Sequence, residues 1–215
     1  MSVARTACRC VAWLLAVLAG SVDAQAVLTP VDEAAIQPDF FSFRAQLAAA
    51  VARRDAAAVL AAVDEQVRTG FGGDDGRAAF ERQWLPDRPD SRLWEALGAV
   101  LALGGSFTGT QQFSAPYVYS RWPEDLDAFE HVAVIASEVR LRAAPRADAA
   151  VIGRASFVVL ELAGPATADG WFPVRTPDGR AGYVARALAR SPLDYRAIFE
   201  RRDGRWQLVA FVSGD

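Results

Sequence analysis

The chain has 215 residues, of which 52% are hydrophobic, so it is long enough to bury one large core or two small ones. Its 23 basic residues are all arginines, and they are interspersed with 26 acids to give a net charge of −3. This distribution leaves no basic patch for nucleic acid or for an anionic membrane surface. The absence of lysine excludes a Schiff base and a serine–lysine dyad, and the single histidine excludes a site built from several histidines.

The first 24 residues have the pattern of a secretory signal. Arginines precede an apolar core at residues 11–18, and small residues at 22–24 form a cleavage site. The apolar core is too short for a permanent membrane anchor. Cleavage would also remove Cys8 and Cys10, the only cysteines of the sequence, which excludes a thiol nucleophile from the mature chain. We therefore expect a periplasmic or secreted protein that folds without disulfides.

A linker at residues 25–38 precedes a helix-rich region. Phe43, Leu47 and Val51 recur every four residues, which places them on one face of a helix. Asp55 can cap a second short helix that follows directly. The region therefore begins with two consecutive helices.

A strand and a third helix are expected next. Val67, Thr69 and Phe71 occupy alternate positions, a pattern typical of a strand. The glycines and acids at residues 72–76 predict a turn and the capped start of a helix that contains Phe80. A phosphate-binding loop is not expected, because two acids stand where phosphate would lie.

A fourth helix follows, and Ser91 can cap it. Gly104 and Gly105 end this helix, and residues 116–119 are expected to be extended. The apolar residues expected to form the buried face of the fourth helix are Leu93, Trp94, Leu97, Val100 and Leu101.

The densest cluster of ionisable groups precedes the β-rich part of the chain. It contains Glu124, Asp125, Asp127, Glu130 and His131. A metal site or a serine triad would use such groups, but the spacing is not that of a calcium loop and no G-x-S-x-G occurs. We interpret the cluster as a solvated, helix-initiating segment and expect no metal, no cofactor and no catalytic residue.

Five short motifs then occur in order between residues 138 and 188. Short strands with turn residues at this spacing predict a small all-β barrel. The motifs are Val139 to Pro145, Val151 to Gly153, Gly170-Trp171 with Val174, Asp178-Gly179 with Gly182-Tyr183-Val184, and Leu188. Their order resembles the bacterial SH3-like domain, over roughly residues 136–190.

This resemblance implies a recognition module for peptide or cell-wall material. Aromatic residues of that family often contact ligand, which implies Trp171 and Tyr183 here, although Trp171 equally fits packing in the barrel core. Arg142 and Tyr183 are candidates for a surface groove, with Asp178 at the adjacent turn. The four residues form the predicted ligand-binding set.

Two strands after the barrel predict a hairpin. Residues 194–202 and 205–212 are rich in apolar side chains, and Asp203-Gly204 between them is a two-residue turn signal. The second strand is apolar on both faces, so it should be buried. Because an isolated hairpin is marginal in water, this one must pack against the helix-rich region.

These segments together predict an α+β fold. Residues 39–132 and 192–215 would form one α+β domain, with an SH3-like barrel at 133–191 inserted between them. Three motifs of this α+β domain are Phe71-Gly72-Gly73, Phe80 to Trp84, and Gly204 to Phe211. With these motifs, the domain resembles the nuclear-transport-factor-like, or cystatin-like, α+β roll.

We interpret the chain as a secreted, non-catalytic binding protein whose partner is peptide, peptidoglycan or another envelope protein. An alternative is a roll that binds a small ligand or is purely structural, braced by the barrel. A second alternative is a carboxylate-dependent peptidoglycan hydrolase, because glycoside cleavage requires only Asp or Glu side chains.

Deleting residues 193–215 should unfold the helix-rich region, because the hairpin is expected to complete its core. Circular dichroism during heating would show the loss of the cooperative transition. A truncated protein that keeps this transition would show that the hairpin is an appendage.

Overall fold

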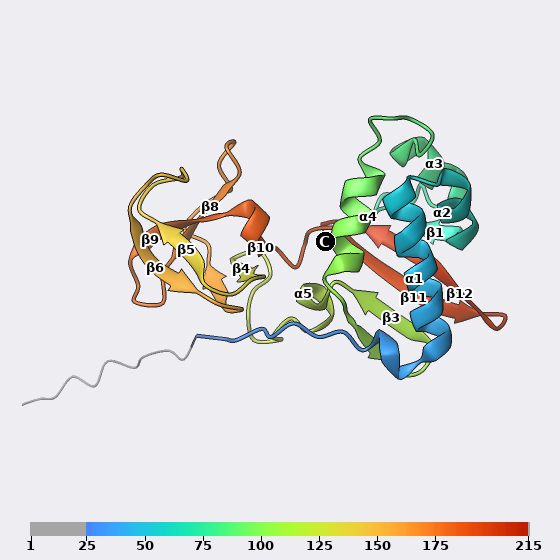
Figure 1. Ribbon diagram of the computed structural model, residues 1–215, viewed down its shortest axis with the longest axis horizontal. Coiled ribbons are helices and arrows are strands. Elements are labelled where there is room, and N and C mark those ends of the chain that lie inside the picture. The colour runs from blue at the N-terminus through green and yellow to red at the C-terminus, as the bar shows by residue number, and fades with distance from the viewer. Residues whose placement is uncertain (1–24, 215) are drawn as a thin grey trace, which may run out of the picture.

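The computed structural model describes residues 25–214, and the predicted signal at 1–24 lies outside them (Figure 1). The elements are η1 (Ala34–Ile36), α1 (Pro38–Arg53), α2 (Ala56–Ala62), β1 (Val63–Arg68), α3 (Arg77–Trp84), α4 (Leu93–Ala102), β2 (Ser106–Thr108), β3 (Gln112–Ala115), α5 (Tyr117–Ser120), β4 (His131–Val134), β5 (Val139–Arg142), β6 (Val151–Ala155), β7 (Val159–Glu161), β8 (Trp171–Arg175), β9 (Ala181–Ala185), η2 (Arg186–Leu188), β10 (Ala189–Arg190), β11 (Arg196–Arg202) and β12 (Arg205–Val212). The fold is a mixed α+β fold, as predicted. No helix among the described residues combines the length and apolar composition needed to cross a bilayer.

A five-stranded sheet organises the helix-rich part, which we call the helical lobe (residues 34–120 and 196–212). Its strand order is β1-β12-β11-β3-β2. The predicted hairpin around Asp203-Gly204 is confirmed, since β11 and β12 pair antiparallel across it. The outer side of β12 pairs with β1 and the outer side of β11 with β3, so the hairpin lies inside the sheet with a neighbour on each side.

Helices α1 and α4 cover one face of this sheet (Figure 1). Leu47 and Val51 of α1 and Leu97 of α4 are buried in the same core as Phe199 and Phe211 of the hairpin. The predicted buried stripe of α4 is therefore confirmed, and so are Leu47 and Val51 of α1, whereas Phe43 is only partly buried. The hairpin supplies the opposite side of that core, because apolar faces of helices and sheets are stable only when they cover one another.

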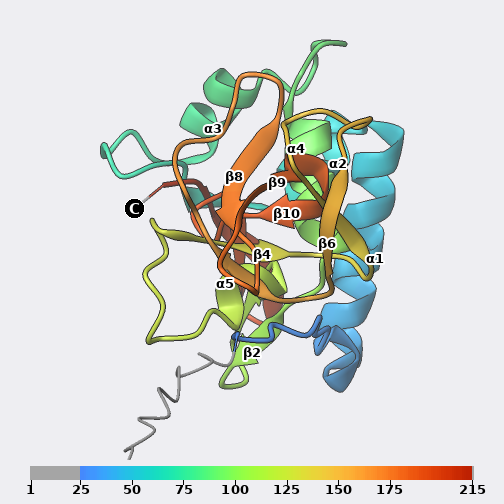
Figure 2. The same ribbon diagram turned by 90° about the vertical axis from the view of Figure 1, so that its left-hand side faces the viewer.

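Residues 131–190 form a second, β-rich lobe. Its strands make a three-stranded sheet, β10-β4-β7, and a four-stranded sheet, β6-β5-β9-β8. The two sheets share a core of their own that contains Val132, Leu141, Leu160, Phe172 and Val184. No sheet among the described strands is closed into a barrel. Figure 2 views the molecule from this lobe, with β6, β8 and β9 towards the viewer.

Residues 25–33, expected as a linker, form a strap that pairs with both lobes (Figure 1). At one end, the amide N–H of Leu28 donates to Phe157 O (2.8 Å), and the N–H of Val159 donates to Ala26 O (2.9 Å). At the other end, the N–H of Gly105 donates to Val31 O (2.9 Å). The strap thus joins the β-rich lobe to the helical lobe by backbone hydrogen bonds.

Two glycines after α4 allow neighbouring segments to approach closely. A Cβ atom on Gly104 would lie 2.5 Å from Val31 O, and one on Gly105 would lie 2.2 Å from Ser114 O. Gly104 also has a φ of +62°, a backbone conformation that side chains disfavour. The glycine pair therefore ends α4 as predicted. Gly104 also makes room for the strap, and Gly105 makes room for β3.

A small joint core lies where the strap meets both lobes. It contains Leu28 of the strap, Tyr117 and Val118 of α5, Ala133 of β4, and Val159 of β7. Tyr117 is so deeply buried that its hydroxyl has no hydrogen-bond partner, and desolvation raises the pKa of this group to about 12. The joint core gives the two lobes a common apolar contact in addition to the strap.

Some local expectations were wrong. The strand expected at 67–71 is β1, which starts at Val63 and ends at Arg68, and Phe71 is exposed beyond it. The N-cap of α3 is Gly76, while the carboxylate of Asp75 instead accepts a hydrogen bond from the N–H of Thr69. The acidic segment after α5 forms turns that lead into β4 rather than the start of a helix.

Residues 117–120 are the short helix α5 rather than extended chain. Its side chains enter the joint core. The expectation of an extended segment at residues 116–119 was therefore wrong, and the helix places Tyr117 and Val118 in the joint core.

Replacing Leu28 with alanine should destabilise the protein by about 2–5 kcal/mol, because this side chain is 5% exposed within the joint core. The neighbouring Val27 is 66% exposed, so Val27→Ala is a matched control with an expected change below about 0.5 kcal/mol. Urea denaturation of the two variants measures the difference. Equal, small effects would show that the strap adds no apolar stabilisation.

Candidate functional site

Three of the four predicted ligand-binding residues share the outer face of the sheet β6-β5-β9-β8. Arg142 of β5 lies opposite Tyr183 of β9, and Trp171 of β8 lies opposite Ala185, two residues from Tyr183 on the same face. All three side chains are half-buried, and Arg142 Nη1 donates to Ala149 O (2.8 Å). We call Arg142, Trp171 and Tyr183 the outer sheet face.

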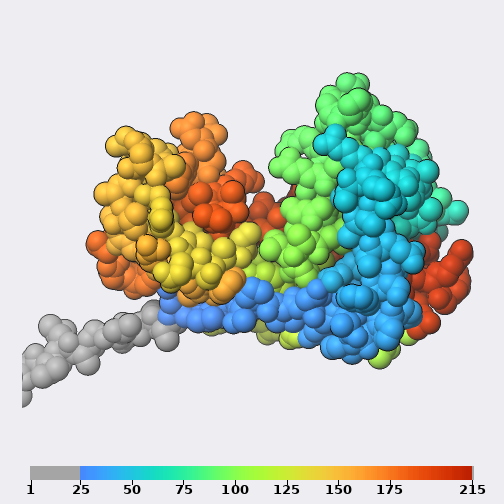
Figure 3. All heavy atoms as spheres, viewed as in Figure 1, coloured from blue at the N-terminus to red at the C-terminus, as the bar shows by residue number. Residues whose placement is uncertain are grey.

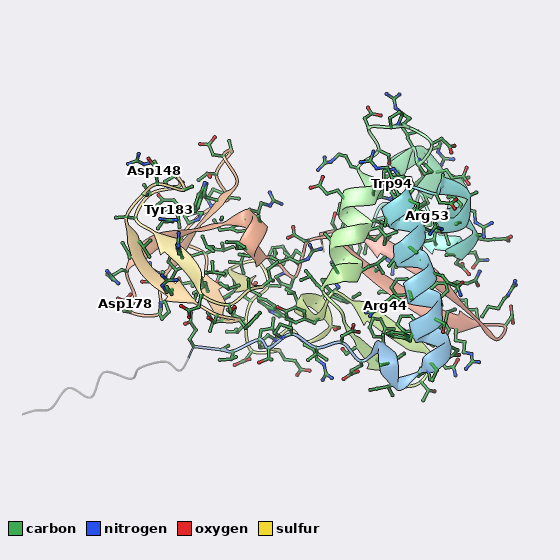
Figure 4. All side chains as sticks on the ribbon, in the orientation of Figure 1. Arg44, Arg53, Trp94, Asp148, Asp178 and Tyr183 are labelled. Carbon is green, nitrogen blue, oxygen red and sulfur yellow. The ribbon has the colours of Figure 1, made fainter. Side chains whose placement is uncertain are left out.

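Asp178 does not join this group. It lies in the exposed turn between β8 and β9, and Figure 4 places it at the edge of the lobe away from Tyr183. Its carboxylate accepts hydrogen bonds from Thr176 Oγ1 and from Arg180 Nε (2.7 Å). The hydrogen bond from Thr176 is the largest of the effects that hold its pKa below the usual value, and burial opposes them. The carboxylate therefore stabilises its own turn.

A cleft lies between the two lobes, with a volume of about 1030 Å³. Figure 3 shows the surface hollowed between the β-rich lobe and α4. The residues that line it are Gln83, Trp84, Leu85, Arg88, Asp90, Ser91, Arg92, Glu95, Ala96, Ala99, Ala102, Leu103, Ile135, Gly170, Arg186, Ala187, Ala189, Arg190, Asp194 and Tyr195. None of the four predicted site residues is among them.

Helix α4 forms one wall of the cleft with small side chains. Ala96, Ala99 and Ala102 recur at helical spacing on the side away from the buried stripe, and Arg92 and Leu103 extend the same side at its two ends. Because alanine side chains are short, this wall leaves space in front of the helix. From Arg92 to Leu103 the wall is about 16 Å long.

The opposite wall is charged. Arg186, in η2, lies 3.6 Å from the carboxylate of Asp194, and Arg190 of β10 donates from Nη2 to Tyr195 O (2.6 Å). Burial lowers the pKa of Arg190, and the positive charge of Arg186 acts in the same direction, whereas Asp194 opposes both. The wall therefore holds two guanidinium groups close to a single carboxylate.

Aromatic rings close the cleft where α3 meets β11. The rings of Trp84 and Tyr195 have centroids 4.9 Å apart, and both pack against Phe211. Trp84 is 6% exposed, yet its Nε1 has no hydrogen-bond partner. A buried indole N–H usually finds a partner. This end of the cleft thus combines apolar surface with an unused donor.

The interior of the helical lobe is filled by aromatic rings. Phe40 of α1 lies within 4.4–5.7 Å of the rings of Phe107, Phe113, Phe199 and Trp206. This packing occupies the space between α1 and the sheet, where the alternative hypothesis would place a small ligand.

The acidic cluster before β4 does not assemble a site. His131 Nδ1 lies 2.9 Å from the backbone oxygen of Asp127 rather than from a carboxylate. Within residues 25–214, no three His, Cys, Asp or Glu side chains are grouped so that they could hold a metal ion.

Comparisons with known proteins give little further information. No family model matches the sequence, and no curated protein is significantly similar to it. A solved structure titled as a putative calcium/calmodulin-dependent protein kinase II association domain, from Xanthomonas campestris, is similar at 13% identity and a TM-score of 0.23 over 81% of each chain. A likeness with so low a TM-score supports no inference about fold or function.

The lining of the cleft was missed at the sequence level. One signal was available: the alanines of α4 lie on a face that the buried stripe does not use. Such a face is usually solvent-exposed, so the pattern alone does not predict a cleft. Nothing in the local sequence indicates that Arg190 and Trp84 border the same space.

Asp178→Asn should lower the melting temperature near neutral pH, because the ionised carboxylate stabilises the turn. The folded-state pKa lies below the unfolded value, so this contribution is present above pH about 4 and is lost as the pH falls through the folded pKa. Thermal melts of both proteins across this range should therefore converge in acid. A difference that persists at the lowest pH would contradict this account.

Proposed function

We propose that the protein is a secreted or periplasmic, non-catalytic binding protein that takes peptide or cell-wall material into the cleft between its lobes. The observation that carries the proposal is the cleft itself, which has about 1030 Å³ of space and mixed apolar and charged walls. Binding sites are typically concave surfaces of this kind, with a few polar groups that orient the ligand. One wall comes from α4, and the other comes mainly from the segment that resembles SH3-like domains.

We infer that residues 133–191 form an SH3-like unit inserted into a roll-like domain made of residues 39–132 and 192–215. In support, β3 and β11 are neighbours in one sheet although the β-rich lobe separates them in the sequence. The β-rich lobe also has a hydrophobic core of its own. Insertion between adjacent strands places the two units side by side, which creates the cleft.

The dimensions of the cleft suit a short peptide. The α4 wall is about 16 Å long, which matches about five residues of extended chain. The alanines of α4 leave room for a backbone to approach, and Trp84 and Tyr195 offer apolar contact for a side chain. A small molecule is the second candidate, because small-molecule pockets have volumes up to about 1,000 Å³.

A carboxylate-dependent hydrolase fits the cleft less well. A general acid needs a raised pKa, but the hydrogen bond from Arg88 lowers the pKa of Asp90. Asp90 thus lacks the environment that this chemistry requires. Asp194 forms an ion pair of 3.6 Å with Arg186.

Ala99→Trp should prevent binding to insoluble peptidoglycan, because an indole on the α4 wall would fill the cleft. Ala99 is exposed, so the fold should tolerate the change. Ala48→Trp, at an exposed position of α1 outside the cleft, is the matched control and should bind like the unmodified protein. Co-sedimentation of the mature protein with peptidoglycan measures the effect.

Tyr183→Ala tests the outer sheet face in the same assay and should leave binding unchanged. If Tyr183→Ala abolishes sedimentation and Ala99→Trp does not, the binding site is the outer sheet face. Unmodified protein that stays in the supernatant would overturn the proposed function. Release of soluble muropeptides, lost in Glu95→Gln, would identify a hydrolase instead.

A further inference from the structure

Arg190 is a charged side chain in the cleft without an ionic partner. It belongs to β10, where it lies opposite Ala133 of β4, so the sheet fixes its backbone. Nη2 donates to Tyr195 O, whereas Nε is buried and has no hydrogen-bond partner. No carboxylate among the described residues lies within ion-pair distance of this guanidinium.

Such an arrangement is costly in the unliganded protein. Burial of a guanidinium loses hydration that only an anion or several hydrogen bonds can replace. The depressed pKa of Arg190 has burial as its main cause, and Arg186 adds repulsion. An anion that enters the cleft would supply the missing counter-charge, so the guanidinium favours anionic ligands.

The other charges of the cleft limit which anion fits. Glu95 lies on the α4 wall, Asp90 lies in the turn before that helix, and Asp194 lies beside Arg186. Three carboxylates would repel a phosphate dianion more strongly than a singly charged group. A carboxylate matches the planar fork of arginine and carries one charge. Because both signs of charge line the cleft, a peptide with an ammonium group as well as a carboxylate is also accommodated.

We propose that the cleft binds a carboxylate-bearing extended peptide, and that Arg190 is the residue that receives the carboxylate. This inference rests on the proposed function of the cleft as a binding site. The next part of the peptide would follow the alanines of α4, with an apolar side chain against Trp84 and Tyr195. The carboxylate belongs either to the C-terminus of the peptide or to an acidic side chain.

The test uses muropeptides released from peptidoglycan by a muramidase, and the same mixture after conversion of its carboxylates to amides. Retention on immobilised full-length protein measures binding. The unmodified mixture should be retained, and amidation should weaken binding by about tenfold to a hundredfold, as expected for loss of a charge-assisted hydrogen bond. Two synthetic pentapeptides locate the group: one has a free C-terminus and no acidic residue, and the other has a C-terminal amide and a central glutamate.

Arg190→Met should produce the same loss as amidation, and Arg190→Lys should recover part of the affinity because it keeps the charge without the planar fork. Arg140→Met removes an exposed arginine from β5, outside the cleft, and is the matched control. Thermal melts confirm that each variant is folded. Arg190→Lys keeps the test decisive if the methionine variant is unstable.

The outcomes separate the two proposals. If amidated muropeptides bind as well as unmodified ones and Ala99→Trp abolishes both, the carboxylate inference is wrong and the cleft remains the binding site. If Arg190→Met binds normally, Arg190 is not the anchor. If neither mixture binds to the unmodified protein, the proposed function and this inference both fail.

Discussion

The side chain of Leu28 lies between α5 of one lobe and β7 of the other, and the arrangement of the two lobes depends on this contact. The strap brings Leu28 there through backbone hydrogen bonds to Phe157 and Val159. Burial at the joint core removes apolar surface of both lobes from water at a single place, which gives the contact its stability. Because the lobes are joined at this point, they can form two walls with a space between them, and neither lobe needs to fill that space.

The protein distributes its large and small side chains unevenly. The interior of the helical lobe is crowded with phenylalanine rings around Phe40, whereas the side of α4 that faces the other lobe carries alanines. Dense packing on one side of α4 fixes the helix, since well-packed cores resist displacement. The other side can then remain open at no cost to that core. A binding surface on a rigid element keeps its geometry, which favours recognition of a defined ligand.

Sequence patterns predicted those parts of the fold whose cause is local. The apolar stripe through Leu97 predicted α4, and the Asp203-Gly204 turn predicted the hairpin. Both signals are local, because periodicity and turn chemistry depend on near neighbours. Strand β1 was misplaced by several residues, since its limits depend on pairing with β12 at the other end of the chain. The cleft was not predictable for the same reason. Arg190 and Ala99 are brought together by the joint core and the sheet order. Both of these causes depend on contacts between distant segments, which a local sequence pattern does not indicate.

The parallel pairing of β1 with β12 has a consequence for the synthesis of the protein. Strand β1 leaves the ribosome long before β12, so its pairing edge stays open while the whole β-rich lobe is made. The β-rich lobe has its own core and can fold during this interval, whereas the helical lobe must wait for the last residues of the chain. Contacts so distant in sequence form slowly, and an open strand edge invites association with other chains. The edge of β1 in a protein of this topology is therefore open to such association until β12 has been made.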